Sequence, residues 1–372
     1  MTIAPKAMPK YDGEHDGEDD CGHDKMRVSL IFEAAGPMTT VQDLGRYGAQ
    51  RMGIPPSGAL DPVSLRLANA LVGNPQGTAG LELRFLGPKI RIEGGPVRIA
   101  SVGTYAPIDI LEPTPVRIPS GRSVLLADGQ VFRIGGIPDT SCSYLAFSGT
   151  FDLAPLFESM ATFQASRLGG LDGRAIQDGD RIDLIVDEPP LGPDRMLMRS
   201  FEWDDRAPIR IVPGPQADYF TQEAFETLLS EPYEISRMSS RMALRLEGAP
   251  LDHAKGFNIP SDGVVNGSIQ VPGNKMPIIL MVDRQTTGGY PKIATVISAD
   301  LPRLGRALPG QKLRFAAVEV EEAEEIRRRM ESDIQSLIDA IGSTSSTVED
   351  MNSVLMRQNL ISGAISASGQ DG

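Results

Sequence analysis

Short apolar runs, separated by glycine and proline, dominate the chain from Val28 onward. Through the first half they recur at a spacing of roughly 8 to 12 residues, which is typical of an all-β sandwich or barrel. Two later runs, at residues 277–282 and 293–297, have the length and the β-branched content of strands. The pattern therefore predicts a mainly β protein.

Three segments break this pattern and predict helices. Residues 64–72 are amphipathic and follow Asp61 and Pro62, a pair that suits an N-cap and the first helical position. Residues 221–229 predict a second short helix. Residues 320–341 carry acidic side chains first and arginines later, the order that the helix dipole favours, and their continuous apolar stripe predicts that one face is packed.

Length and composition indicate how these elements are divided. The 372-residue chain is longer than a typical single core, so its length favours two domains. A stretch rich in Pro, Asp and Gly at residues 188–206 suits a linker between them. We expect a disordered acidic tail, a first and a second β domain, a C-terminal helix and a flexible tail, at residues 1–27, 28–205, 206–318, 319–342 and 343–372 respectively.

The acidic N-terminal tail contains a group of potential metal ligands, His15, Cys21 and His23. The group lacks the second anchoring pair of ligands that structural zinc sites show, so we expect no metal site there. In the C-terminal tail, residues 348–360 predict only a weak helix.

Charge and cysteine content limit the class of protein. The formal net charge of -13 argues against nucleic acid or an anionic membrane as the partner. Cys21 and Cys142 lie far apart, which favours a reduced, cytoplasmic protein. No apolar run approaches the roughly 18 residues needed to cross a bilayer, and the polar N-terminus lacks the apolar core of a signal peptide.

A strongly polar segment, residues 283–292, lies between the two later strands. Its Gly-Gly pair frees the backbone to turn and to admit another group closely, while Arg, Gln and Thr supply donors for a carboxylate, amide or phosphate. The segment therefore predicts a binding loop, although a Gly-Gly pair also predicts an ordinary hairpin turn. The candidate residues in the loop are Asp283, Arg284, Gln285, Thr286, Thr287, Gly288, Gly289, Tyr290 and Lys292.

Polar residues also gather between residues 36 and 82, where a core would exclude them. Flanked by glycines, this mixed set of donors and acceptors predicts a loop wall of a ligand pocket. The set comprises Gln42, Asp43, Arg46, Ser57, Gly58, Asp61, Asn69 and Asn74. Some of these residues also have a structural explanation. N-capping explains Asp61, and a helix C-terminal turn explains Asn74. Asp43 with Arg46 could form a structural ion pair.

Several common catalytic patterns are missing from the sequence. Ser57 lies in GIPPSGAL, which is not a G-x-S-x-G elbow, and His253 is the only histidine of the predicted globular part. There is no P-loop, no GxGxxG fingerprint, no metal-ligand spacing and no lysine motif for biotin attachment. If ATP or carboxybiotin is used, another protein is expected to contribute part of that chemistry.

The string DRQTTGGYPKIATVISADLPRLG, preceded by SDGVVNGSIQVPG and followed by LPGQKLRF, resembles the KipA-like family. That family comprises the C subunit of the bacterial ATP-dependent 5-oxoprolinase, often labelled allophanate hydrolase subunit 2, and is related to the carboxyltransferase domain of urea carboxylase. A second matching block spans residues 36–82, and the resemblance covers roughly residues 28–318.

The resemblance implies two tandem cyclophilin-like β-barrel domains with the site in the cleft between them. It implies ATP-dependent opening of the 5-oxoproline lactam to glutamate, with ATP shared between this chain, a KipI-like subunit and a LamB/YcsF-like subunit, and little activity for the chain alone. In such a reaction Arg284, Thr286, Thr287 and Lys292 would stabilise developing charge. Asp283 or Asp262 would act as general base.

Two other functions fit the same family. One is biotin-dependent carboxyl transfer to urea or a related amide, and the other is regulation through binding of a KipI-like kinase inhibitor. The chain also departs from the family pattern: ASVGTYAP at residues 100–107 lacks an acidic residue, and Glu158, Ser159 and Met160 replace a GSRST-like loop. These departures change the expected contribution of the first domain to the pocket.

Overall fold

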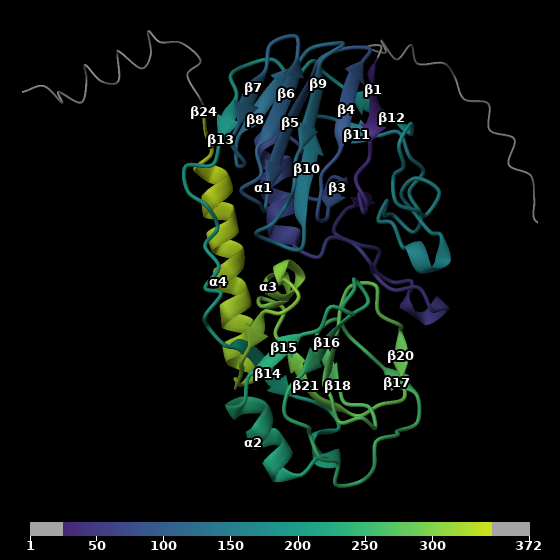
Figure 1. The fold of residues 1–372 in the computed structure, drawn as a ribbon, viewed down its shortest axis with the longest axis vertical. Coiled ribbons are helices and arrows are strands. Elements are labelled where there is room, and N and C mark those ends of the chain that lie inside the picture. The colour runs from purple at the N-terminus through teal and green to yellow at the C-terminus, as the bar shows by residue number, and fades with distance from the viewer. Residues whose placement is uncertain (1–24, 344–372) are drawn as a thin grey trace, which may run out of the picture.

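The computed structural model describes residues 25–343. Two β-rich units lie one above the other, and a long helix runs along the side of both (Figure 1). The group of potential metal ligands (His15, Cys21 and His23) and the weak helix at residues 348–360 lie outside the described residues, as do most residues of the two predicted tails.

The first unit is built from two antiparallel sheets whose apolar faces enclose a common core. The seven-stranded sheet contains, in spatial order, β11 (Thr150–Phe151), β12 (Arg181–Val186), β1 (Met26–Ala34), β4 (Lys89–Glu93), β9 (Val131–Ile134), β6 (Ile108–Glu112) and β7 (Val116–Ile118). The five-stranded sheet contains β2 (Thr40–Gln42), β3 (Gly80–Leu83), β10 (Ser143–Phe147), β5 (Val97–Val102) and β8 (Ser123–Leu126). Strand β1 begins two residues earlier than the predicted domain boundary, because Met26 and Arg27 pair with the end of β12.

Helix α1 (Pro62–Val72) packs against β5 and β10 of the five-stranded sheet. The side chain of Asp61 accepts hydrogen bonds from the backbone N–H groups of Val63 and Ser64, at 3.0 and 3.1 Å. Gly73 ends the helix in the left-handed conformation, with φ of 90°. The predicted N-cap and helix are therefore confirmed.

The second unit is built around one eight-stranded sheet. Its spatial order is β22 (Lys312–Leu313), β15 (Tyr233–Ile235), β16 (Ala243–Glu247), β19 (Ile278–Leu280), β18 (Ser268–Gln270), β21 (Lys292–Val296), β14 (Ile209–Pro213) and β23 (Phe315–Ala317). The two outermost strands, β22 and β23, are separated in sequence by Arg314 alone, so the sheet nearly closes on itself. The prediction of a mainly β fold is confirmed.

Helix α2 (Gln222–Ser230) starts one residue after the predicted position, with Thr221 as its N-cap. A further helix, α3 (Leu301–Arg306), was not predicted, because its six residues include a proline and a glycine and show no helical periodicity. The remaining short elements are η1 (Gln50–Met52), η2 (Gln164–Ser166), η3 (Ala217–Tyr219), β13 (Arg195–Met196), β17 (Asp262–Gly263), β20 (Thr287–Gly288) and β24 (Gly342–Ser343).

The long C-terminal helix, α4 (Val320–Asp339), connects the two units. Its predicted apolar stripe is buried at Ile334 and Leu337, which belong to the core shared by both units. After the helix, β24 pairs with β13, a strand inside the predicted linker at residues 188–206. The chain therefore returns from the second unit to the first.

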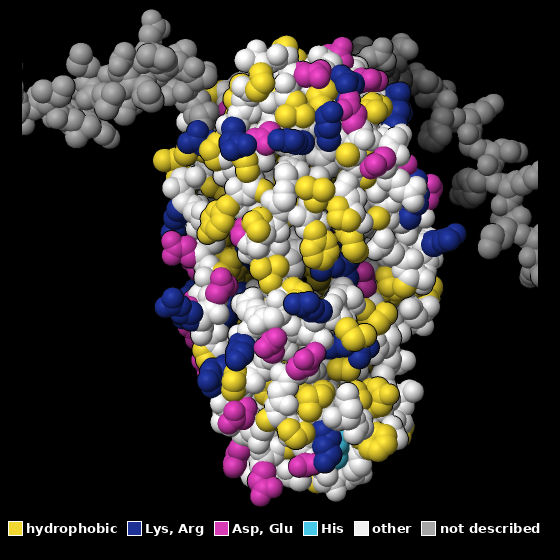
Figure 2. All heavy atoms as spheres, in the orientation of Figure 1, with side chains coloured by type: hydrophobic (Ala, Val, Ile, Leu, Met, Phe, Trp, Pro, Cys, Tyr) yellow, Lys and Arg dark blue, Asp and Glu magenta, His cyan; other side chains and the backbone are white. Residues whose placement is uncertain are grey.

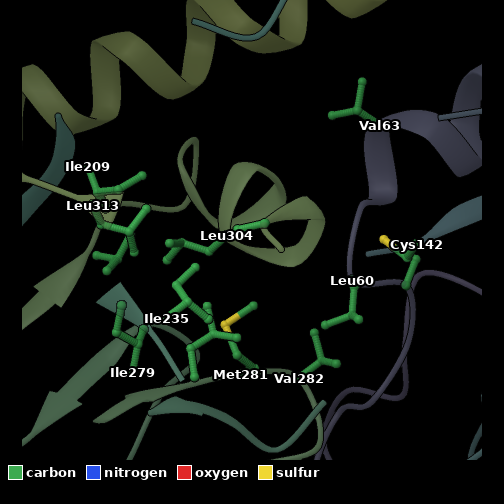
Figure 3. Close-up of a cluster of buried hydrophobic side chains, with 14 of the residues drawn as sticks. Leu60, Val63, Cys142, Ile209, Ile235, Ile279, Met281, Val282, Leu304 and Leu313 are labelled. Carbon is green, nitrogen blue, oxygen red and sulfur yellow. The ribbon is translucent and has the colours of Figure 1, made fainter. Parts of the chain in front are cut away.

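The junction of the two units is apolar at its centre. Leu60, Val63 and Cys142 of the first unit belong to the same buried cluster as Met281 and Leu304 of the second (Figure 3). Helix α3 lies in the middle of this cluster. The fit is close, because a Cβ atom on Gly305 would collide with the carbonyl oxygen of Leu60.

Candidate functional site

A cleft of about 680 Å³ opens between the two units and helix α4. This volume is within the range of small-molecule sites. Figure 2 shows Lys and Arg side chains on the surface at the level where the two units meet. The cleft walls come from three parts of the chain: the segment from residue 44 to 76, the segment from residue 265 to 302, and α4 between residues 327 and 334.

The charged residues of the cleft are mostly cationic. Arg66, Arg284 and Arg327 line it, against the single carboxylate of Glu331. Glu331 forms an ion pair with Arg66, and the Nη1 atom of Arg66 lies 2.9 Å from the Oε2 atom of Glu331. Within residues 25–343, neither Arg284 nor Arg327 has a carboxylate within ion-pair distance. In a chain with a net charge of -13, this local positive charge indicates an anionic ligand.

Arg284 is the predicted loop residue that lines the cleft. It is only 4% exposed, and its Nε donates a single long hydrogen bond of 3.3 Å to the carbonyl oxygen of Val264. Burial lowers the pKa of Arg284, and the nearby Tyr47 opposes that shift. The side chain nevertheless remains charged, because arginine does not deprotonate in proteins. A buried guanidinium with free donors is suited to a carboxylate or phosphate.

Backbone hydrogen bonds bring two more cleft residues beside the start of this loop. The N–H of Ser57 donates to the carbonyl of Val282 at 3.1 Å, and the N–H of Gly267, next to Asn266, donates to that of Leu280 at 2.7 Å. Ser57 adopts the left-handed conformation, with φ of 54°, which is strained for a serine. Ser57 Oγ and Asn266 Oδ1 are both buried without a hydrogen-bond partner in the described part of the chain.

Sequence reasoning included Ser57 but missed Asn266. An Asn-Gly pair such as Asn266-Gly267 ordinarily indicates a turn, so the sequence gives no sign that the side chain of Asn266 has another role. Its position at the cleft wall, with an unpaired buried oxygen, shows that Asn266 is available to bind a ligand.

Three predicted residues, Gln42, Asp43 and Arg46, do not line the cleft. The alternative that Asp43 and Arg46 form an ion pair is wrong within the described residues. Asp43 instead accepts hydrogen bonds from Ser159 Oγ at 2.8 Å and from the N–H of Met160 at 2.6 Å. The residues that replace the expected GSRST-like loop therefore hold this carboxylate.

Arg46 is almost fully buried and incompletely paired. Its Nη2 donates to the carbonyl of Ala161, whereas Nε and Nη1 have no partner among residues 25–343. Burial lowers the pKa of Arg46, while the carboxylates of Asp43 and Asp283 act in the opposite direction. Gln42 is similar: its Nε2 donates to the carbonyl of Thr162 at 3.1 Å, and its Oε1 is unpaired within the same range.

A fully paired arginine, Arg241, connects the two units and was not predicted. Its Nη1 donates to Glu82 Oε1 at 2.6 Å, its Nε to Asp283 Oδ2 at 2.8 Å and its Nη2 to the carbonyl of Gly58 at 2.7 Å. Glu82 also accepts from the hydroxyl of Tyr144 at 2.6 Å. We refer to Arg241, Glu82, Asp283 and Tyr144 as the junction network.

The junction network changes the interpretation of Asp283. Both of its carboxylate oxygens accept from Arg241, it is 8% exposed, and it does not line the cleft. A general base must reach the proton that it removes, so this position opposes the predicted role. Burial lowers the pKa of Arg241, but Glu82 and Asp283 raise it further, leaving it above its ordinary value.

Lys292 and Asp262 form a separate ion pair away from the cleft walls. The Nζ of the buried Lys292 lies 2.6 Å from Oδ2 of the exposed Asp262, which also accepts from Gln216 at 3.3 Å. The hydrogen bond from Lys292 is the main cause that lowers the pKa of Asp262. A lowered pKa makes a carboxylate a weaker base, so this geometry also opposes the predicted role of Asp262.

The rest of the loop packs over strand β18. Gln270 of β18 donates to the carbonyl of Tyr290 at 3.3 Å and accepts from Gln285 at 3.4 Å. The pair Thr287–Gly288 forms β20 and bonds to β17, and Gly288 approaches Gln270 so closely that a Cβ atom would collide with it. The loop is not a hairpin turn, because its flanking strands β19 and β21 are separated by β18. Within residues 25–343, the hydrogen bonds of Thr286 and Gly289 are backbone bonds, to Val264 and Ile259.

The remaining candidates of the first unit have structural roles. Gly58 accepts from Arg241 and has no space for a Cβ atom against Gly45. Asn74 donates to the carbonyl of Phe147 at 2.8 Å, and Asn69 donates to that of Thr78 at 2.7 Å.

Two features are absent from residues 25–343. No helix there is long and apolar enough to span a membrane. No cluster of three or more His, Cys, Asp or Glu side chains in that range could hold a metal ion.

Comparison with known proteins identifies the family. The family model of the carboxyltransferase domain, subdomains A and B, matches residues 52–317. The C subunit of 5-oxoprolinase from Escherichia coli (strain K12) is 34% identical over 301 residues, which cover 79% of this chain and 93% of the relative. A putative urea carboxylase of Emericella nidulans is 32% identical over 320 residues, covering 82% of this chain and 25% of the relative.

Solved structures agree with the sequence relatives. The crystal structure of the Kluyveromyces lactis urea carboxylase superposes with a TM-score of 0.74 at 25% identity, covering 89% of this chain and 31% of that chain. Helix α4 lies beyond the residues that the family model matches. The predicted resemblance is confirmed, and the chain belongs to the family of carboxyltransferase domains built from subdomains A and B.

Proposed function

We propose that this chain is one subunit of a 5-oxoprolinase that opens the 5-oxoproline lactam to glutamate at the expense of ATP. The observation that carries the proposal is the similarity to the C subunit of the E. coli 5-oxoprolinase, which extends over 93% of that relative at 34% identity. The cationic cleft supports it, because 5-oxoproline is a small carboxylic acid.

In this proposal the cleft binds and orients the substrate. The substrate carboxylate pairs with Arg284, which has free donors and no carboxylate partner within residues 25–343. The lactam ring lies against the wall that carries Ser57. Holding the ring in one orientation lowers the entropic part of the barrier to attack on the lactam carbonyl.

The proposal assigns proton transfer and ATP chemistry partly to other proteins of the complex. Asp283 is held by Arg241, and Asp262 has a lowered pKa and lies outside the cleft walls, so neither suits a general base. We propose that two partners, one KipI-like and one LamB/YcsF-like, complete the site and share the binding of ATP. Lys292, paired with Asp262, remains a candidate for a contact with these partners or with ATP.

A second candidate function is carboxyl transfer from carboxybiotin on another protein to urea or a related amide. The structural similarity to the K. lactis urea carboxylase favours it. This chain spans only 25% of the E. nidulans relative. A regulatory role through binding of a KipI-like protein is the third candidate.

Reconstitution separates these functions. The full chain is purified alone and with its KipI-like and LamB/YcsF-like partners, and glutamate release from 5-oxoproline is measured with and without ATP. We expect ATP-dependent glutamate release from the complex and little from the chain alone. Equal turnover by the isolated chain would contradict the dependence on partners. If the complex assembles but releases no glutamate from 5-oxoproline, the proposed function is contradicted. Capture of a biotinylated carboxylase by the chain would favour the second candidate.

A further inference from the structure

Asn266 has a side-chain amide that makes no hydrogen bond with the described part of the chain. Its Oδ1 is buried and unpaired, and its Nδ2 makes no hydrogen bond within residues 25–343. A half-buried amide normally pairs with protein groups, because leaving a buried polar atom unpaired costs about 1 to 3 kcal/mol. The position therefore indicates that Asn266 is kept for a group that does not belong to the described chain.

The backbone fixes Asn266 near Arg284. The N–H of Gly267, the residue after Asn266, donates to the carbonyl of Leu280 at 2.7 Å, and the N–H of Arg284 donates to that of Met281 at 3.2 Å. The two side chains therefore start from neighbouring backbone positions, and both line the same cleft. One small ligand can contact both.

The two side chains have complementary chemistry. The guanidinium of Arg284 offers several donors and a positive charge, which suit a carboxylate. The amide of Asn266 offers a donor and an acceptor side by side. A lactam presents the opposite arrangement, because the ring holds its N–H and C=O on the same side of the amide bond.

We propose that Asn266 recognises the lactam of the ligand through a paired N–H and C=O contact, while Arg284 holds the carboxylate. This assignment rests on the proposed function and names the residue that distinguishes a lactam from a similar ring. Because Oδ1 is covered in the structure, the double contact requires a rotation of the side chain, and no side-chain hydrogen bond within residues 25–343 resists that rotation.

The inference predicts a preference for lactams that depends on Asn266. Binding of 5-oxoproline to the full chain is compared, by calorimetry, with binding of the lactone in which a ring oxygen replaces the N–H. We expect wild type to bind the lactam at least about tenfold more tightly, because the lactone leaves Asn266 Oδ1 unpaired. Asn266→Ala should remove this preference by weakening the lactam more than the lactone, because the lactone makes only the carbonyl contact with Asn266.

Two control variants separate recognition from general damage. Asn274→Ala changes an exposed asparagine of the same unit, outside the cleft, and should keep the preference. Arg284→Gln should weaken both ligands by the same factor and leave their ratio unchanged, because both carry the carboxylate.

Each outcome decides between the inference and the proposed function. The inference is overturned if Asn266→Ala leaves the ratio of lactam to lactone affinity unchanged. It is also overturned if the wild-type chain does not bind 5-oxoproline. Glutamate release by the wild-type complex in either of these cases leaves the proposed function in place. A shifted ratio without glutamate release by the complex supports lactam recognition and contradicts the proposed function.

Discussion

Arg241 and Arg284 are both buried arginines of the second unit, yet their surroundings differ. Arg241 donates to two carboxylates and to the carbonyl of Gly58, at distances from 2.6 to 3.2 Å. Arg284 has a single long bond to Val264 and no carboxylate partner in the part of the chain that the structure describes. The fold pairs every nitrogen of the first guanidinium, whereas the second keeps donors that are free to bind a ligand.

This difference indicates that one buried arginine stabilises the fold and the other is available for ligand binding. Breaking a closed buried network is costly, because removing one member leaves its partners charged and unpaired. An open donor set at a cleft contributes little to folding and is available to a ligand. We therefore expect the junction network to set the geometry of the cleft, and Arg284 to use that geometry for binding.

The largest effect should come from removing Arg241. Arg241→Ala leaves Glu82 and Asp283 buried without their counter-charge, so we expect a loss of about 3 to 5 kcal/mol in the free energy of unfolding. Denaturant titration of the full chain measures it. Arg245→Ala, at an exposed arginine of β16, is the matched control and should change stability by less than about 0.5 kcal/mol. A loss from Arg241→Ala no larger than that of the control would show that the network is not needed for folding.

Arg284 should show the opposite behaviour. Arg284→Ala is expected to lower turnover by the reconstituted complex about 100-fold, or about 2.7 kcal/mol, with a change in the free energy of unfolding below about 1 kcal/mol. Arg284→Lys should lose much of the activity despite keeping the charge, because the forked geometry is lost. Unchanged turnover in Arg284→Ala would assign the loop a purely structural role.

A smaller, pH-dependent effect should appear at Glu82. Burial raises the pKa of Glu82, but Arg241 and the hydrogen bonds from Tyr144 and Leu60 lower it further, to below the ordinary 4.5. The stabilisation is then complete above about pH 4.5 and is lost as pH falls through the lowered pKa. We expect Glu82→Gln to cost about 2 kcal/mol at neutral pH.

The difference between wild type and Glu82→Gln should shrink as the pH falls below about 4.5, because wild type also loses its charged carboxylate there. Denaturant midpoints across the acid range measure this difference. Glu247→Gln, at an exposed position of β16, serves as the control. A difference that stays constant into acid would contradict the assignment of the charge to Glu82.

The sequence predicted the features that depend on neighbouring residues. The alternation of short apolar runs predicted the mainly β fold, and Asp61 with Pro62 predicted the start of α1, because an N-cap acts over three residues. The apolar stripe of α4 could be predicted because its residues repeat every three to four positions within one segment. The family strings were also local and specific enough to identify the family.

Features that depend on distant contacts could not be predicted. Arg241 lies in SRMSSRM, which suggests a surface arginine, and its partner Glu82 is 159 residues away in sequence. The contact between Asp283 and Arg241, which opposes the predicted role of Asp283 as general base, also joins residues that are distant in sequence. Asn266 was hidden by the turn signal of its following glycine. The positions of the site residues therefore required the packing of the two units.

The most direct test of the account is a crystal structure of the full chain with 5-oxoproline. The account predicts the ligand in the cleft between the units, with its carboxylate within hydrogen-bond distance of Arg284 and the junction network unchanged. A ligand bound instead at Lys292 and Asp262, with Arg284 uncontacted, would contradict the division between the two arginines and would move the site to that ion pair.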